Sequence, residues 1–272
     1  MSSFIPIFII NRVCETERLL HCRNQLEKFF DPFQIHVSTA FEKSEAMALR
    51  HGFFSYVAYQ NLNSLSSDLV LPTWSAAACA LSHYHLWMQI AERKEQMVMV
   101  VEDDFMVTNT EKFRFRFNEI AHFFLQRGEK EEAICCLMDG KIIDNGPVPR
   151  LPPDPLKPIT RIFYNTTRTH AYLLNPAAAR LLIRYFLPIT YQVDIQMSVL
   201  ARENSQFYFF NCHDAGTAQS PSFSSQTQYH HLTLSECLEL FPDIIATTIH
   251  AFLDISDRVM NSPNFSYYSY SS

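Results

Sequence analysis

The chain has 272 residues, of which 47% are hydrophobic and 18% charged, and its formal net charge is −6. This composition predicts a folded globular protein, and the negative balance excludes a general electrostatic attraction to nucleic acid. The five glycines are too dispersed to form a glycine-rich phosphate loop or a dinucleotide-binding fingerprint. If a nucleotide diphosphate binds, we therefore expect a metal ion rather than a glycine loop to anchor it.

The cysteines and the N-terminus predict a cytoplasmic protein. There are seven cysteines, an odd number, and no two have the spacing of a zinc site, so we expect reduced and mostly buried thiols. The N-terminus lacks a basic region followed by a long apolar segment, and no apolar run is long enough to span a membrane. We expect a cytoplasmic location without a transmembrane segment, and peripheral attachment to a membrane stays open.

The N-terminal region predicts a strand, a helix and a second strand. The first strand covers Phe4–Ile10, and the polar residue Asn11 follows it. Glu15–Phe30 has the apolar spacing of a helix, with Leu20 among the residues of its buried face. A second strand is expected at Phe33–Val37. A strand followed directly by a helix is typical of the start of a βαβ unit.

Residues 76–107 predict a helix, a charged turn and a buried strand. Apolar side chains recur at helical spacing after Ser75, which can cap the helix. Met97–Val101 is a continuous apolar run, as expected of a strand that is covered on both faces. Ligands of open α/β sheets bind beyond the carboxyl ends of strands, so the residues after this strand are candidates for a site.

Three adjacent carboxylates, Glu102, Asp103 and Asp104, stand directly at the end of that strand. Because these groups repel one another, we expect a positive partner beside them. A hard divalent cation, which takes oxygen ligands and can also bind phosphate oxygens, is a natural candidate. The alternative is a solvated, charged turn.

The second half of the chain continues the alternation of helices and strands. Helices are predicted over Asn109–Gln126 and Pro176–Phe186, the latter capped by Asn175. Buried strands are predicted over Ala133–Met138 and Gln206–Phe210. The chain is therefore expected to form an α/β domain over residues 1–230.

The C-terminal region has a different character. Residues 231–260 predict a helical extension, with a capping box formed by Thr233 and Glu236. Its apolar stripe could cover the sheet or a second subunit, so a homodimer through these helices is one possibility. Residues 261–272 are rich in serine and tyrosine and are expected to be a disordered tail.

The order of these blocks resembles glycosyltransferase family 25, the group of bacterial lipopolysaccharide and animal procollagen galactosyltransferases. The resemblance is carried by Cys79-Ala80-Leu81-Ser82-His83, the aromatic-bearing helix around it, and the strand that ends at Glu102-Asp103-Asp104. Tyr191-Gln192-Val193-Asp194 is similar to a later Pro-Val-Asp segment of the family. The family usually has Glu and Gly before the cysteine, where this chain has Ala76 and Ala78.

The resemblance spans roughly residues 3–228. It implies a GT-A-type, Rossmann-like fold with a mostly parallel central sheet flanked by helices. It also implies a UDP-sugar-dependent hexosyltransferase that moves galactose or glucose to a hydroxyl of a glycan, lipopolysaccharide or protein, with inversion. The implied cofactor is Mn²⁺ or Mg²⁺, and UDP-hexose is the implied donor. The metal ligands matched by the resemblance are Glu102, Asp103, Asp104 and His213.

Asp194 is the candidate for catalysis, because an inverting transfer needs a carboxylate that accepts the proton of the attacking hydroxyl. The same residue could instead orient the acceptor, bind the metal or cap a helix that begins at Ile195. The residues that match the donor-binding motifs of the family are Ile10, Asn11, Arg18, Ser82, His83, Thr169, His170, Tyr172, Gln219 and Ser224.

Two other functions stay open. A metal-dependent phosphotransferase or nuclease could use the same acids, but the chain has neither a second acidic cluster nor a phosphate-binding loop. A catalytically degenerate GT-A domain could bind UDP, a glycan or a protein without turnover. The altered residues before Cys79 favour this second alternative.

Overall fold

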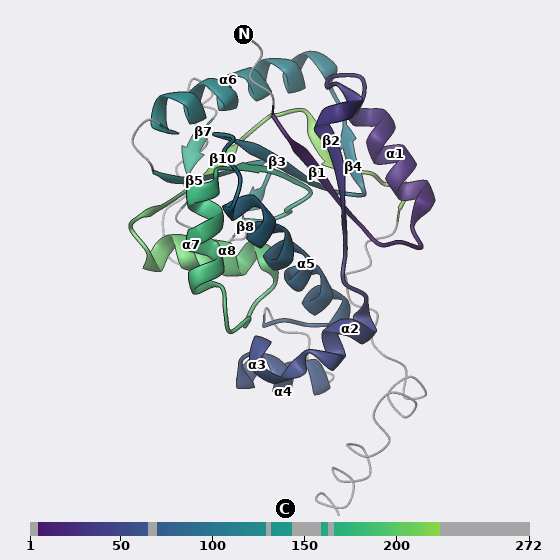
Figure 1. Ribbon diagram of the computed structural model, residues 1–272, viewed down its shortest axis with the longest axis vertical. Coiled ribbons are helices and arrows are strands. Elements are labelled where there is room, and N and C mark those ends of the chain that lie inside the picture. Colours follow the sequence, from purple (N-terminus) through teal and green to yellow (C-terminus); the bar gives the residue numbers. More distant parts are fainter. Residues whose placement is uncertain (1–4, 65–69, 129–131, 143–158, 163–165, 224–272) are drawn as a thin grey trace, which may run out of the picture. The chain divides into compact units, whose positions relative to one another are not determined.

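The computed structural model describes residues 5–64, 70–128, 132–142, 159–162 and 166–223 (Figure 1). Its centre is a seven-stranded sheet in the order β2-β1-β3-β9-β5-β10-β7. The strands of this sheet are β1 (Ile7–Asn11), β2 (Ile35–Thr39), β3 (Val98–Glu102), β5 (Ala133–Met138), β7 (Ile159–Arg161), β9 (Ala171–Leu174) and β10 (Phe207–Cys212). All except β9 and β7 run in the same direction. The predicted Rossmann-like α/β fold with a mostly parallel sheet is therefore confirmed.

Helices cover both faces of this sheet (Figure 1). On one face lie α1 (Thr16–Leu26) and α6 (Thr110–Gly128), and on the other lie α5 (Trp74–Ala91), α7 (Pro176–Tyr185) and α8 (Val193–Glu203). Alternate strand residues point to the α1 and α6 face, since side chains of a strand alternate between the two faces of a sheet. There they form one core with the predicted apolar face of α6: Phe113, Phe117, Ile120 and Phe124.

Smaller elements complete the described part of the chain. The helical turn η1 (Pro32–Gln34) precedes β2, and three short helices lie between β2 and α5. These helices are α2 (Lys43–Ala48), α3 (Arg50–Phe53) and α4 (Tyr56–Asn63). Two short ladders pair β4 (Phe105–Val107) with β11 (Thr217–Gln219), and β6 (Lys141–Ile142) with β8 (Thr166–Thr167). The first ladder matters most for function, because it brings Gln219 opposite Phe105, beside the acidic turn after β3.

Two predicted helix starts are corrected. The hydroxyl of Thr73, not Ser75, caps α5, and it accepts a hydrogen bond from the backbone nitrogen of Ala76 at 3.0 Å. The helix therefore begins two residues earlier than the apolar spacing suggested. Helix α8 begins at Val193, so Asp194 lies in its first turn rather than at the N-cap position.

Helix α1 is shorter than predicted, and one residue of its predicted buried face points to solvent. It ends at Leu26 instead of continuing to Phe30. Leu20, which was assigned to the buried face, is 61% exposed, whereas Arg18 is 8% exposed. The physical reason is the acidic turn after β3, which attracts the guanidinium group to the inner side of the helix.

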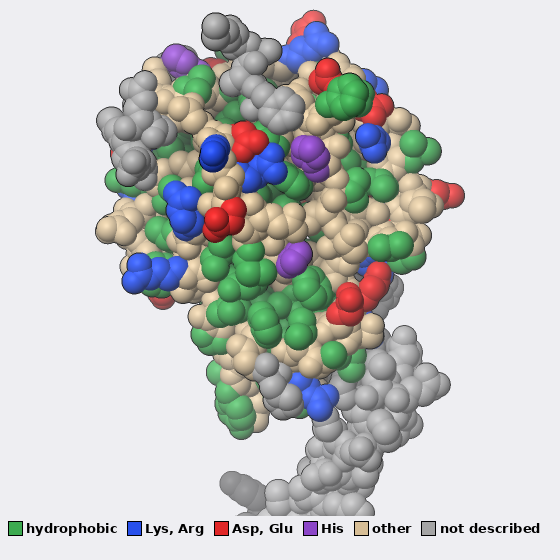
Figure 2. Space-filling model, viewed as in Figure 1, with side chains coloured by type: hydrophobic (Ala, Val, Ile, Leu, Met, Phe, Trp, Pro, Cys, Tyr) green, Lys and Arg blue, Asp and Glu red, His purple; other side chains and the backbone are tan. Residues whose placement is uncertain are grey.

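Several predictions concern residues outside the described ranges. They are the helical extension over 231–260, the homodimer that it could form, the tail over 261–272 and the binding role of Ser224. None of the described helices combines the length and the apolar character that a membrane crossing requires. The six described cysteines are free thiols. On the face shown in Figure 2, acidic and basic side chains are interspersed, so this face carries no uniform field of one sign.

The turn between β10 and β11 depends on a glycine. Gly216 has a φ of +73°, and a Cβ atom at this position would lie 2.8 Å from the backbone oxygen of Asn109. Gly52 also has a positive φ, +95°, but no atom lies within 4 Å of its would-be Cβ. Replacing Gly52 would therefore cause backbone strain alone, whereas replacing Gly216 would cause both backbone strain and a steric collision.

We expect Gly216→Ala to lower the free energy of unfolding by about 2–3 kcal/mol, and Gly52→Ala by about 1 kcal/mol, because only the first adds a collision to the strain of a positive φ. Urea denaturation of both variants measures the difference. Equal losses in the two variants would contradict the steric argument.

Candidate functional site

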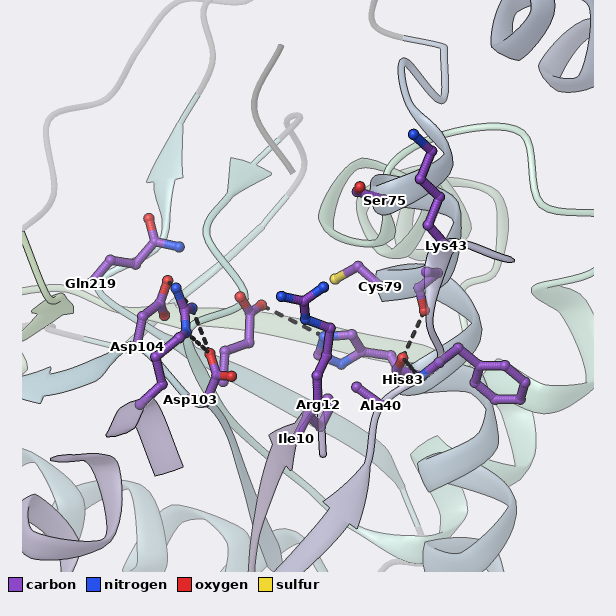
Figure 3. A pocket seen from close by; sticks show the side chains of 15 residues that line it. Ile10, Arg12, Ala40, Lys43, Ser75, Cys79, His83, Asp103, Asp104 and Gln219 are labelled. Atoms are coloured by element: carbon purple, nitrogen blue, oxygen red, sulfur yellow. Dashed lines mark hydrogen bonds and ion pairs between the residues drawn. The ribbon is translucent and has the colours of Figure 1, made fainter. Parts of the chain in front are cut away.

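A pocket opens at the carboxyl ends of β1 and β3, where ligands bind in open α/β sheets (Figure 3). Its wall is built from β1, α1, α5, the turn after β3, and β11. We call it the acid pocket. It brings together eight of the predicted site residues: Ile10, Arg18, Ser82, His83, Glu102, Asp103, Asp104 and Gln219.

One buried arginine holds two of the three carboxylates. Arg18 Nε donates to Asp103 Oδ1 at 2.7 Å, and Arg18 Nη2 lies 3.3 Å from Asp104 Oδ2. The other oxygen of Asp104, Oδ1, is buried and has no hydrogen-bond partner among the residues that the structure describes. Burial and the charge of Glu102 raise the pKa of Asp104 to about 7, although Arg18 opposes this shift. Burial also raises the pKa of Asp103. The single guanidinium of Arg18 does not neutralise all three carboxylates, so the cluster keeps an excess of negative charge.

Glu102 is held by a chain of hydrogen bonds that begins in the core. Trp87 Nε1 donates to the Tyr172 hydroxyl at 2.9 Å, and this hydroxyl lies 2.8 Å from His83 Nδ1. The other ring nitrogen, His83 Nε2, has no hydrogen-bond partner among the described residues and lies 3.6 Å from Glu102 Oε1. Thr169 Oγ1 donates to the same carboxylate oxygen at 2.5 Å.

These contacts keep Glu102 ionised. Burial alone would raise the pKa of Glu102, but the adjacent imidazole of His83 and the hydrogen bond from the Thr169 hydroxyl outweigh it and lower the pKa. Glu102 and Asp104 are therefore pushed in opposite directions, although only one residue separates them. Two nearby carboxyl groups with diverging pKa values are characteristic of functional sites.

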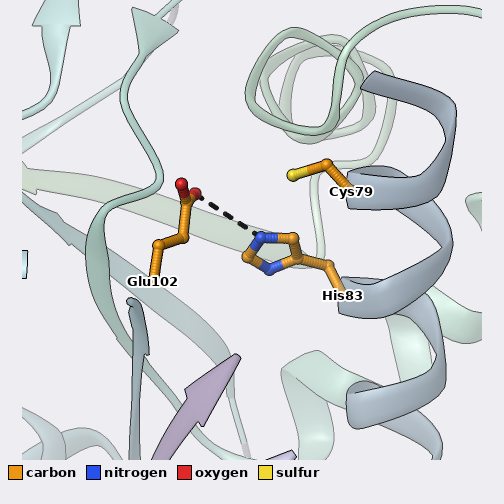
Figure 4. A group of neighbouring side chains, drawn as sticks. All are labelled: Cys79, His83 and Glu102. Atoms are coloured by element: carbon orange, nitrogen blue, oxygen red, sulfur yellow. Dashed lines mark ion pairs between the residues drawn. The ribbon is translucent and has the colours of Figure 1, made fainter. Parts of the chain in front are cut away.

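The side chains of Cys79, His83 and Glu102 lie close together, and one ligand atom of each falls within 4.8 Å of the others (Figure 4). Such a donor set would suit zinc. Burial and the surrounding acids raise the pKa of Cys79 well above its usual value, so without a metal this group is a thiol. The carboxylates of Glu102 and Asp104, with the unpartnered Oδ1, fit a hard divalent cation better.

Other predicted residues shape the wall of the acid pocket. Ser82 Oγ accepts from the backbone nitrogen of Phe41 at 2.8 Å and donates to Ala78 O at 2.7 Å, so it ties the loop after β2 to α5. Asn11 is buried, and its Nδ2 donates to Arg12 O at 2.6 Å. Its Oδ1 is buried and has no hydrogen-bond partner among the described residues, and Asn11 does not line the acid pocket. The hydroxyl of Ser82 is already used in two hydrogen bonds.

Residues 168–170 form the next wall along the sheet edge. The backbone nitrogen of Glu102 donates to His170 O at 3.0 Å, and His170 Nε2 lies 3.1 Å from Thr217 Oγ1. Burial lowers the pKa of His170 to about 4, so this ring is neutral at physiological pH. Asp194 lies behind this wall, accepting from the backbone nitrogens of Arg168 at 3.0 Å and Ile195 at 2.8 Å.

Asp194 is 8% exposed, and burial raises its pKa to about 6. It does not line the acid pocket, although its charge and that of Glu102 influence each other. Each oxygen accepts one backbone hydrogen bond and keeps lone pairs for a further proton. Its position is therefore adjacent to the acid pocket and separated from it by residues 168–170.

Six of the predicted residues that the structure describes do not line the acid pocket: Asn11, Thr169, His170, Tyr172, Asp194 and His213. His213 Nε2 lies 3.0 Å from Thr160 Oγ1, and His213 lines a different cavity together with Asp139 and Arg168. The structure does not place this ring beside the three acids. Ser224 lies outside the described residues.

Sequence reasoning passed over several members of the site, among them Arg12, Lys43 and Cys79, which line the acid pocket. It also passed over Trp87, which supports His83 through Tyr172. Cys79, His83 and Trp87 are spaced four residues apart, so they lie on one face of α5. That spacing was the signal that could have identified them.

Comparison with known proteins finds one family. A family model described as glycosyltransferase family 25 (LPS biosynthesis protein) matches residues 4–197, which is well over half of the chain. A search of curated proteins finds no match.

The buried charge of Asp104 predicts a dependence of stability on pH. Because its pKa is raised to about 7 from an ordinary 3.8, the folded state holds this proton more tightly than the unfolded state. The stability that the protonated group provides is complete below about pH 4 and is lost as the pH rises to about 7.

Asp104→Asn, which stays neutral, should therefore be more stable than the wild type at pH 8 by on the order of 2 kcal/mol, with the gap closing toward pH 4. Urea denaturation between pH 4 and 8 with a chelator present measures this difference. Parallel stability curves for the two proteins would contradict the assignment.

The Tyr172 hydroxyl connects two buried polar groups, Trp87 Nε1 and His83 Nδ1. Tyr172→Phe leaves both without this partner, and we expect it to lower the free energy of unfolding by about 2 kcal/mol. Tyr185→Phe is the control, because Tyr185 is 43% exposed and should tolerate the change. Thermal denaturation of both variants provides the measurement, and a loss no larger than that of the control would show that the hydroxyl is dispensable.

Proposed function

Because the chain belongs to glycosyltransferase family 25, we propose that it is a metal-dependent hexosyltransferase that uses a UDP-sugar. The family itself supports a glycosyltransferase role in glycan or lipopolysaccharide biosynthesis. Our proposal adds that galactose or glucose moves, with inversion, to a hydroxyl of a glycan, lipopolysaccharide or protein. The observation that carries it is the unpartnered, buried Oδ1 of Asp104 in a cluster of acids at a strand end.

The acid pocket supplies the features that a sugar nucleotide requires. Ile10 and Phe41 line the acid pocket and offer apolar surface to a nucleobase. Glu102 and Asp104 would hold a divalent cation, which would neutralise the charge that develops on the diphosphate leaving group. We propose that the fold is of the GT-A type, in which these elements form the donor site.

Arg18 has a positioning role in this proposal. It neutralises Asp103 and one oxygen of Asp104, so the cluster can be assembled before any ligand arrives. The second oxygen of Asp104 is left for the cation. A rigid, pre-assembled site of this kind loses little entropy on binding.

For the transfer itself we assign Asp194 as the base. The acceptor oxygen attacks the anomeric carbon and forms the new glycosidic bond, while the bond from that carbon to the phosphate oxygen breaks and UDP leaves with the electron pair. The proton of the acceptor hydroxyl passes to the Asp194 carboxylate. A pKa of about 6 is suited to this task, because the group is ionised at neutral pH and still accepts a proton readily.

One observation favours a second candidate, a degenerate domain that binds UDP or a glycan without turnover. Ala78 lines the acid pocket at the position where the family usually has glycine, so the pocket is narrower there by a methyl group. The family's preceding glutamate is Ala76 in this chain. Binding of UDP without transfer or hydrolysis would identify this alternative.

The test is UDP release from a panel of UDP-sugars with Mn²⁺ or with a chelator, a slow hydrolysis that requires no known acceptor. We expect release from one hexose donor only when metal is present. Asp104→Ala and Asp194→Asn should each lower the rate by at least about 100-fold, the first through metal binding and the second through loss of the base. Calorimetry should show that only Asp104→Ala also weakens UDP binding.

Glu203→Gln serves as the control, since Glu203 is an exposed acid at the end of α8. Its rate should match that of the wild type. If UDP does not bind at all, with or without metal, the transferase proposal fails and the acids form only a charged turn.

A further inference from the structure

A second cavity lies next to the acid pocket, at the carboxyl ends of β5 and β10. Its volume is about 400 Å³, and its lining is mostly polar. We call it the β5/β10 cavity. Its chemistry is set by Asp139, Lys141, Arg168, His213 and Thr217.

The basic groups of this cavity are available, whereas its acids are occupied. Asp139 accepts hydrogen bonds from the backbone nitrogens of Ala215 and Thr217, each at 2.9 Å, and from the Thr217 hydroxyl at 3.1 Å. The other acid of the lining, Asp214, is paired with Lys112 at 2.7 Å.

By contrast, Lys141 and Arg168 are exposed, and among the residues that the structure describes neither has an ion-pair partner. Two free cations therefore face the cavity beside acids that are already satisfied. Because Lys112 neutralises Asp214, Lys141 and Arg168 face the single negative charge of Asp139. The net charge around the cavity is therefore positive, which favours an anionic ligand.

The backbone around the cavity is strained. Asp139, Arg168 and Asp214 have φ values of 54°, 80° and 57°, and they are the non-glycine residues with positive φ in the described chain. All three line this one cavity. The conformation is especially unfavourable for arginine, and Asp194 stabilises it by accepting the Arg168 backbone N–H at 3.0 Å. Strained residues that the surroundings hold in place cluster at ligand sites.

The β5/β10 cavity and the acid pocket share one wall. The sheet order β3-β9-β5-β10 places the ends of these strands side by side, with residues 168–170 leading into β9 between them. Thr169 donates to Glu102 on one side of this wall. On the other side, Arg168 lines the cavity, and His170 contacts Thr217.

We propose that the β5/β10 cavity is an acceptor subsite that binds an anionic substituent, a carboxylate or phosphate group, on the acceptor glycan. This inference rests on the transferase function proposed above. The guanidinium of Arg168 can bind two oxygens of such a group at once, and the ammonium of Lys141 adds a second charge-assisted hydrogen bond. An acidic sugar residue bound here would place a neighbouring hydroxyl toward the donor site across the shared wall.

The experiment uses three probes on the full chain: galacturonic acid, galactose 6-phosphate and the neutral methyl galactoside. Ligand-observed NMR titrations give their affinities for the wild type, the double variant Lys141→Gln/Arg168→Gln, and Arg184→Gln. Arg184 is an exposed arginine on α7 and serves as the matched control. Circular dichroism checks that each variant is folded, and UDP binding with Mn²⁺ is measured in parallel.

We expect at least one anionic probe to bind the wild type about tenfold more tightly than the neutral sugar, and the double variant to lose this preference. The control should keep the preference, and UDP affinity should be unchanged in all variants. Preference for the carboxylate or for the phosphate would identify the substituent.

UDP binding without any preference for anionic probes would overturn this inference and leave the transferase proposal intact. If the preference survives in the double variant, or disappears equally in the control, the anionic group does not bind in the β5/β10 cavity. If UDP does not bind to the wild type, the transferase proposal fails and the acceptor role of the cavity fails with it.

Discussion

The contact between Arg18 and the two aspartates after β3 is the constraint on which the site depends. Three carboxylates at the end of a buried strand would repel one another and oppose folding. The arginine projects from α1 into this cluster and neutralises part of its charge. This contact fixes which side of α1 faces the sheet, and it explains why an aliphatic residue, Leu20, points to solvent. The orientation of α1 about its own axis therefore depends on the carboxylates that follow β3.

Glu102 is stabilised by other elements than the two aspartates are. Its partners come from α5 and from the segment that leads into β9, and they end in a hydrogen-bonded chain that reaches the core at Trp87. As a result, Glu102 and Asp104 have different surroundings although only one residue separates them. Glu102 lies beside polar side chains, whereas Asp104 is buried with too little positive charge near it. The imbalance is a property of the packing and not of the acidic sequence, which would look the same in a solvated turn.

The sequence predicted the parts of this architecture that local chemistry controls. Apolar runs identified β1, β2, β3, β5 and β10, and Asn175 with the following proline marked the start of α7 as the structure has it. The acids were assigned to a site because they follow a buried strand, and His83 was added to it through the resemblance to the family. Contacts between distant segments could not be predicted, since no local pattern encodes them. The pairing of β11 with β4 and the position of His213 in a separate cavity are of this kind.

The antiparallel strand β9 has a consequence for the order in which the protein can be assembled. It lies in the middle of the sheet, between β3 and β5, yet it follows both in the chain. During synthesis, β3 and β5 therefore leave the ribosome with exposed, unpaired edges that attract other strands. Only the emergence of Ala171–Leu174 joins the two halves of the sheet. The sheet can therefore close only after β9 has been synthesised. Residues 168–170, which directly precede β9, take their place between the acid pocket and the β5/β10 cavity in the same step.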